Sequence, residues 1–190
     1  YWDAARVKLA GIKYQVVGSS DNALVAFKTK ELDVVTISGN QVSSVEKDAE
    51  MSKELSVTGA GYMWYVTFSQ TANNAQGGML ANANLRLAIS NAIDRESIVE
   101  NYVMDGSLAT YTAVPPQFAA GPDGSDFSAD QEKFSDVCAD DTEKAAAYYE
   151  KAKEELGTDS FEFELLVEDQ TETQNVAAVV KDQIEKALPL

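Results

Sequence analysis

Residues 84–95 read NLRLAISNAIDR, and they decide more of the fold than any other stretch. The apolar residues recur at intervals of three and four, which places them along one face of an α-helix: Leu85, Ala88, Ile89, Ala92 and Ile93. A second amphipathic stretch, 96–104, follows and stops before Gly106. The sequence therefore predicts two consecutive helices that each bury one side.

Four other stretches alternate apolar and polar residues, as β-strands do: 12–17, 32–38, 62–69 and 161–167. The third is the strongest, because Tyr62, Trp64, Val66 and Phe68 share one side. Either this strand forms one wall of a cleft, or it lies at the centre of a sheet with helices on both faces. Both interpretations place it in a sheet.

Further helices are predicted over 21–30, within 41–54, over 140–156 and in the stretch that carries Val176, Val180, Ile184 and Leu188. Asp140-x-x-Glu143 has the pattern of a capping box, and Gly157 is a natural helix end. Strands that alternate with helices indicate an α/β fold, here a mixed sheet flanked by helices. The polar segment from Pro115 to Asp141 exceeds the roughly 12–15 residues of ordinary loops, so it is functional, wraps the surface or is partly mobile.

The composition argues against several functions. The chain has 31 acidic and 15 basic residues, a formal charge of −16, which disfavours nucleic acid and anionic membranes as partners. The absence of histidine removes Ser-His-Asp and Cys-His catalysis. The single Cys138 cannot form an internal disulfide, and no apolar run is long enough to span a bilayer. We therefore expect a binding protein rather than an enzyme, with no metal and no cofactor.

Acidic residues gather at 168–173, EDQTET, between a predicted strand and the last helix. Ligands of open α/β sheets bind at the carboxyl ends of strands, and carboxylates there would attract an ammonium group. The structural alternative is that Thr171 or Thr173 caps the helix. Paired carboxylates can also hydrolyse glycosides, but with 31 acidic residues chance pairs are inevitable.

Six motifs follow one another along the chain: YWD at 1–3 with VKL at 7–9, LDVV at 32–35, NLRLAISNAIDR at 84–95, Gly106, VPP at 114–116, and Asp141, Ala145, Ala152 and Leu156-Gly157 on one helix. The third is similar to the signature N-x-R-x-A-[LI]-x-x-A-[IM]-D-R. In this order the motifs resemble the peptide-binding proteins of ABC importers, which include oligopeptide- and dipeptide-binding proteins. The resemblance covers essentially the whole chain.

The resemblance implies a type II periplasmic-binding-protein fold of two lobes, with residues 1–190 forming a single lobe, most of the second. It implies that a peptide binds extended between the lobes through main-chain hydrogen bonds and is delivered to the permease subunits of the importer. The binding protein would be a monomer without a membrane span in this segment. The EKxLP ending at 185–189 and the acidic turn look like those of Gram-positive members, which favours an extracytoplasmic, lipid-anchored protein of the cell surface over a periplasmic one.

The expected ligand contacts are two turns: Ser38, Gly39 and Asn40, and Asp169, Thr171 and Glu172. Thr171 stands where many oligopeptide binders have the Asp that pairs with the α-amino group of the peptide, and Asp169 and Glu172 flank it. Ser69 likewise replaces an Asn of the family. The aromatic residues expected before Asp141 are Phe118, Phe127 and Phe134.

Three alternatives stay open. The same fold could hold a non-peptide ligand or serve pheromone signalling, the chain could be a carboxylate-dependent hydrolase, or it could be a surface interaction protein without a small ligand.

Overall fold

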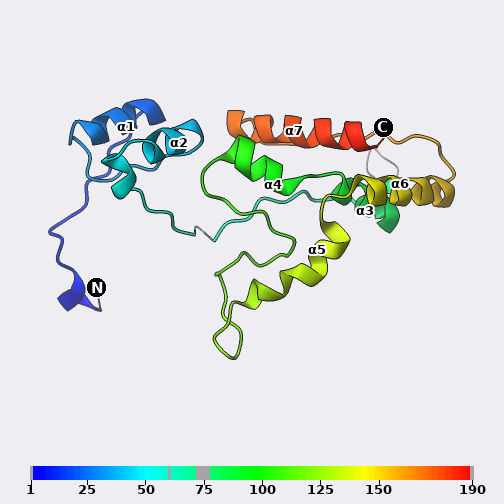
Figure 1. The fold of residues 1–190 in the computed structure, drawn as a ribbon, viewed down its shortest axis with the longest axis horizontal. Coiled ribbons are helices and arrows are strands. Elements are labelled where there is room, and N and C mark those ends of the chain that lie inside the picture. The colour runs from blue at the N-terminus through cyan, green and yellow to red at the C-terminus, as the bar shows by residue number, and fades with distance from the viewer. Residues whose placement is uncertain (1, 60, 72–77, 189–190) are drawn as a thin grey trace.

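The computed structural model describes residues 2–59, 61–71 and 78–188, without the side chains of residues 130–133 and 172. This part of the chain contains seven α-helices: α1 (Ser20–Lys28), α2 (Asn40–Glu46), α3 (Ala83–Asn91), α4 (Arg95–Ile98), α5 (Glu132–Cys138), α6 (Thr142–Leu156) and α7 (Thr171–Ala187). Short 3-10 helices lie at η1 (Ala4–Arg6), η2 (Met51–Lys53), η3 (Met79–Ala81) and η5 (Phe127–Gln131), and a π-helical turn at η4 (Val99–Val103). Figure 1 shows α1 and α2 together at one end of the molecule and α3 to α7 grouped at the other, with extended chain between the two groups.

α3 and α6 pack against each other at the centre of the larger group. Ala88 of α3 and both Ala145 and Ala152 of α6 have an exposed fraction of 0%. Because the distance between packed helices depends on the side chains at the contact, these small residues allow a close approach. Leu85 and Tyr149 complete the contact and are also fully buried. The burial of the apolar side predicted for residues 84–95 is confirmed, although α3 itself ends at Asn91, before Ala92 and Ile93.

α7 and the segment before it close this core. Phe161 is buried, and its ring meets the ring of Tyr149 edge to face, with centroids 5.4 Å apart. Edge-to-face pairs at this distance are favourable beyond the area they bury. Phe163 stacks on Phe161, and Val180 and Leu188 of the C-terminal region join the same cluster. The alternation of residues 161–167 predicts that Phe161, Phe163, Leu165 and Val167 point inward. This is confirmed for Phe161 and Phe163 but is wrong for Leu165 and Val167, which are exposed.

Side-chain caps fix where the central helices begin. The side-chain oxygens of Asn82, Asp94 and Asp141 accept backbone N–H groups at the starts of α3, α4 and α6. The cap of α6 is thus Asp141, one residue later than the predicted capping box, and Gly157 ends the helix at φ 65°. The cap predicted for α7 is wrong, because Gln170 occupies that position and its side chain makes no capping bond.

The predicted mixed sheet is not found among the described residues, where only an isolated antiparallel bridge joins Ala120 and Asp126. The four predicted strands lie outside any helix, and within the described ranges no β-ladder joins them. A strand needs a neighbouring strand for its backbone hydrogen bonds, and the alternation of apolar residues does not indicate which segment provides that neighbour. As a result Val16 is 99% exposed and Trp64 is 61% exposed.

Two helical predictions need correction. Residues 115–141 contain α5 and the short helix η5, which the proline, glycine and aspartate content of this segment concealed. The helix predicted over 96–104 begins as α4 but continues as the π-helical turn η4 and ends at Met104, whose φ is 48°. A left-handed residue there turns the chain into the long segment that follows.

The α3–α6 contact generates a stability prediction. Replacing Ala145 by Leu should lower the free energy of unfolding by about 1–3 kcal/mol, because the added methylenes have no space between the helices. Ala147→Leu, on the exposed side of the same helix, is the matched control and should change stability little. Urea titration, monitored by circular dichroism, measures the free energy of unfolding of both variants. Equal effects of the two substitutions would contradict the close packing.

Candidate functional site

The first predicted contact turn precedes α2. Ser38 and Asn40 are exposed, and Gly39 has φ 56° and ψ −136° at the cap of the helix, a conformation that glycine adopts readily. A Cβ at this position would meet nothing within 4 Å, so the turn faces open space. The next residue, Gln41, donates from Nε2 to Asp21 Oδ1 at 2.6 Å and ties the turn to α1.

The second predicted turn precedes α7. Asp169 and Thr171 are exposed, and Thr171 is the first residue of the helix. Asp169 Oδ1 accepts a hydrogen bond from Gln174 Nε2 at 2.9 Å, which holds its carboxylate beside the first turn of α7. The side chain of Glu172 lies outside the described residues.

The two turns stay separate in the described structure. No hydrogen bond or ion pair among described residues joins Ser38, Gly39 or Asn40 to Asp169 or Thr171. Figure 1 shows the start of α7, in orange, at the end of its group nearest to α1 and α2 in that view. Their role in binding therefore remains a prediction.

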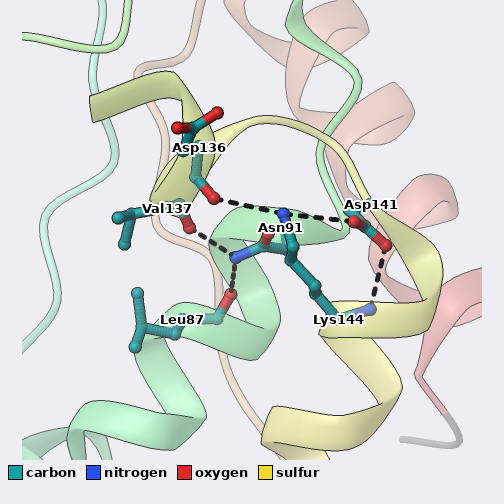
Figure 2. Close-up of polar contacts among 6 residues, drawn as sticks. All are labelled: Leu87, Asn91, Asp136, Val137, Asp141 and Lys144. Carbon is teal, nitrogen blue, oxygen red and sulfur yellow. Dashed lines mark hydrogen bonds and ion pairs between the residues drawn. The ribbon is translucent and has the colours of Figure 1, made fainter. Parts of the chain in front are cut away.

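The long segment 105–141 is anchored by Asn91, a residue without a predicted role. Asn91 is fully buried at the end of α3, and its Nδ2 donates to Leu87 O at 2.8 Å and to Val137 O at 2.9 Å (Figure 2). Its backbone oxygen accepts from the N–H of Asp141 at 2.8 Å. One residue of α3 thus fixes the end of α5 and the start of α6.

Lys144 strengthens the same junction from the side of α6. Its Nζ donates to Asp136 O at 3.2 Å and lies 3.3 Å from Asp141 Oδ2 (Figure 2). Its backbone N–H donates to Asp141 Oδ1 at 2.9 Å. That hydrogen bond is the main reason that the pKa of Asp141 lies below its usual value of 3.8.

Arg95 forms a second anchor on the other side of the junction. Its guanidinium donates to Cys138 O at 2.8 Å and to Ser90 Oγ at 2.9 Å, and it also reaches Ser90 O and Ile93 O. It lies 5.4 Å from the centroid of the Tyr111 ring, within the range of a cation–π interaction. Arg95 therefore links the end of α3, the end of α5 and the middle of the long segment.

The remaining polar residues of NLRLAISNAIDR also hold the structure together. Asn84 Nδ2 donates to the carboxylate of Glu155 on α6 at 2.9 Å, and Arg86 Nη1 donates to Leu80 O and Ala81 O at 2.8 Å each. The Asn–carboxylate contact joins the start of α3 to the end of α6. These residues of the motif thus position helices and loops.

A shallow hollow of about 250 Å³ lies on this anchored segment, lined by Tyr111, Thr112, Ala113 and Phe134. Burial raises the pKa of the Tyr111 hydroxyl, and the nearby Glu96 carboxylate raises it further, whereas Arg95 lowers it. Phe134 is among the aromatic residues of this segment that the sequence predicted, but nothing in the sequence distinguished Tyr111. Its position depends on contacts between distant residues.

The described ranges hold neither a candidate metal centre nor a candidate membrane span. No group of three acidic or cysteine side chains in the described ranges is arranged to hold a metal ion. None of the helices seen in those ranges is long and apolar enough to cross a membrane.

Residues 1–188 match the family described as bacterial extracellular solute-binding proteins, family 5. The chain belongs to this family. It is 28% identical over 162 residues to the oligopeptide-binding protein OppA of Bacillus subtilis, a match that covers 83% of this chain and 27% of OppA. The stretch NLRLAISNAIDR, which forms the helical junction described above, lies within the matched residues.

Two solved structures of the family are similar to this chain. The peptide-bound OppA of Listeria monocytogenes has a TM-score of 0.68 at 25% identity, over 99% of this chain and 36% of that protein. The pheromone receptor PrgZ, whose mode of peptide binding has been described, has a TM-score of 0.71 at 28% identity, over 92% of this chain and 32% of PrgZ. The chain thus spans about a third or less of the length of these relatives.

The buried amide of Asn91 generates a second prediction. Asn91→Asp keeps the shape but replaces the donor by a carboxylate that faces two carbonyl oxygens. An uncompensated buried charge should lower the free energy of unfolding at pH 7 by at least about 3 kcal/mol. Asn101→Asp, on an exposed side chain that donates to Ser97 O, is the control and should cost far less. Chemical denaturation measures both, and similar losses would contradict the anchoring role.

The cap of α6 generates a prediction about pH. Because the pKa of Asp141 is lower in the folded state, its ionised form stabilises the fold above about pH 4, and this contribution is lost as the pH falls through the folded-state value. Asp141→Asn keeps an acceptor oxygen but does not titrate. The loss of stability between pH 6 and pH 3 should be smaller in this variant than in the wild type, as urea titrations can show. The exposed Asp159→Asn is the control, and an unchanged loss in Asp141→Asn would refute the assignment.

Proposed function

We propose that this chain is part of an extracytoplasmic binding protein that captures peptides and delivers them to an ABC importer, and that it catalyses no reaction. The observation that carries the proposal is the family match over residues 1–188. The names of the relatives support it, since they include an oligopeptide-binding protein and a structure with a bound peptide. The lack of histidine agrees with binding rather than acid–base catalysis.

We also propose that residues 1–190 form most of the second lobe of a two-lobed protein, with segments 12–17, 32–38, 62–69 and 161–167 as strands of a mixed sheet. Their exposed apolar side chains support this, because Tyr14, Val16, Tyr62 and Trp64 would otherwise remain in water. The likeness in fold to the Listeria protein supports it too. Pairing would then satisfy both the backbone and the apolar faces of these segments.

The proposed ligand contacts are the turn of Ser38, Gly39 and Asn40 and the turn that carries Asp169, Thr171 and Glu172. The first offers backbone groups beside open space at Gly39. The second offers an exposed carboxylate at Asp169, which suits the ammonium group of a peptide. Backbone contacts at one turn and charge at the other would bind peptides of varied sequence.

The remaining proposals concern place and partners. A monomer anchored by lipid on the surface of a Gram-positive cell fits the EKxLP ending, and the permease subunits of the importer would receive the peptide from it. The high negative charge fits an exposed, soluble domain.

A second candidate function is the reception of a signalling peptide, favoured by the likeness to the pheromone receptor PrgZ. A nutrient scavenger should bind many peptides with similar affinity, whereas a receptor should prefer one sequence strongly. A panel of unrelated peptides of two to eight residues distinguishes the two.

Isothermal titration calorimetry of the full-length protein tests the proposed function. We expect saturable binding of peptides, none of free amino acids, and intact peptide afterwards by mass spectrometry. Asp169→Asn should weaken binding about 3- to 10-fold through the lost charge, whereas the control Asp159→Asn should not. The proposal would be refuted if no peptide binds. It would also be refuted if the protein hydrolyses peptides and Asp169→Asn abolishes that activity.

A further inference from the structure

We propose that the first part of the long segment, residues 105–118, clamps residues 57–61, which lie on the way from one helical group to the other. Two contacts form this clamp: Val57 lies against Gly106, and Phe118 lies against Gly61. The clamp holds the two helical groups of Figure 1 in one arrangement until the contacts open. It is a conformational device of the fold, and it does not depend on which ligand the protein binds.

The clamped stretch has little regular structure of its own. The short helix η2 ends at Lys53 and η3 begins at Met79, and between them the chain runs from the group of α1 and α2 to the group of α3 to α7 (Figure 1). Among the described residues, no backbone hydrogen bond involves residues 57–59 or 61. Such a stretch bends easily through its backbone dihedral angles unless contacts with other segments hold it.

Glycine makes both contacts possible because it has no Cβ. At Gly106, where φ is 88°, a Cβ would lie 3.2 Å from Val57 Cγ1. At Gly61, where φ is 69°, a Cβ would lie 2.9 Å from Phe118 Cε2. Carbon atoms in favourable contact are about 3.5–4.0 Å apart, so a larger residue at either position would push the two segments apart. The positive φ angles add a backbone cost for other residues.

The clamping segment is itself fixed to the larger helical group. It follows η4, and its Tyr111 lies between Gly106 and Phe118 in the sequence. The ring of Tyr111 lies 5.4 Å from the guanidinium of Arg95, which is bonded to the end of α3 and to the end of α5. A single contact would leave the clamped stretch free to turn about that point. Two contacts with one anchored segment resist that motion.

The clamp buries little apolar surface, which makes it easy to open. Val57 is 67% exposed and Phe118 is 65% exposed, and neither belongs to the core of buried residues. Contacts with few buried apolar atoms open locally at a small cost in free energy. Replacing Val57 or Phe118 by alanine should therefore release the clamp and leave the helices folded.

Pulsed electron paramagnetic resonance on the full-length protein, without added peptide, tests the clamp. Spin labels at Val25→Cys on α1 and Ala147→Cys on α6, both exposed positions, measure the distance between the two helical groups. Cys138 and any other cysteine are replaced by serine. We expect one narrow distance distribution in this labelled parent. Gly61→Ala and Gly106→Ala should each shift or broaden it, because the added methyl group pushes the clamped stretch away from segment 105–118.

Two other glycines are matched controls. Gly124 has φ 82°, and a Cβ there would meet nothing within 4 Å, so Gly124→Ala carries the backbone cost without the contact. Gly59 lies in the clamped stretch and also has nothing within 4 Å of a Cβ. Neither substitution should change the distance distribution. Val57→Ala should broaden it, and Gly106→Ala should add nothing in that background, because the side chain that the methyl group would meet is gone.

Circular dichroism shows whether each variant is folded, and if the glycine variants are not, Val57→Ala and Phe118→Ala decide. A broad distribution in the labelled parent would overturn the clamp. So would a distribution that stays unchanged in both Val57→Ala and Phe118→Ala, or one that Gly124→Ala changes as much as Gly106→Ala. Peptide binding is measured separately, so its failure would overturn the proposed function and leave the clamp standing.

Discussion

The contact between α3 and α6 is the constraint on which the rest of the larger helical group depends. It is made by alanines with no exposed surface, Ala88, Ala145 and Ala152, so the two helix axes can lie close together and the larger side chains pack beside the seam. Interiors packed at crystal-like density transmit any change in volume to their neighbours. The contact between α3 and α6 thus fixes both the distance between the helices and the positions of their ends, where the loops begin.

The ends of these two helices organise the long segment 105–141. Asn91 binds the end of α5 and the start of α6, while Arg95 binds the end of α5 and Tyr111. Burying an amide and a guanidinium costs free energy, and their hydrogen bonds as donors offset part of it, although the buried Oδ1 of Asn91 accepts no hydrogen bond in the described structure. The hollow between Tyr111 and Phe134 is therefore part of the same construction as the core. In this way Asn91 and Arg95 shape a surface that they do not themselves line.

The sequence predicted the helices well where apolar periodicity was clear, as in α3, α6 and α7, although the cap predicted for α7 was wrong. It predicted the inward side of Phe161 and Phe163 for the same reason. Periodicity could not predict how a sheet is assembled. The alternation from Tyr62 to Phe68 indicates an extended segment with one apolar side, but it does not indicate which strand pairs with it. Asn91, Tyr111 and the hollow escaped prediction because their roles depend on contacts across 46 residues of sequence or on a surface built from several segments. Of the predicted contact turns, the structure gives the exposure of Asp169 and the open space at Gly39, but not a ligand.

The proposed function requires that the packed pair of α3 and α6 stays rigid while the turns at 38–40 and 168–171 contact the peptide. Hydrogen–deuterium exchange on the full-length protein, with and without saturating peptide, tests this most directly. We expect the amides of α3 and α6 to exchange slowest in both states, and peptide to slow exchange at 38–40 and at 168–171. Rapid exchange in α3 and α6, or protection by peptide confined to regions away from those two turns, would contradict it.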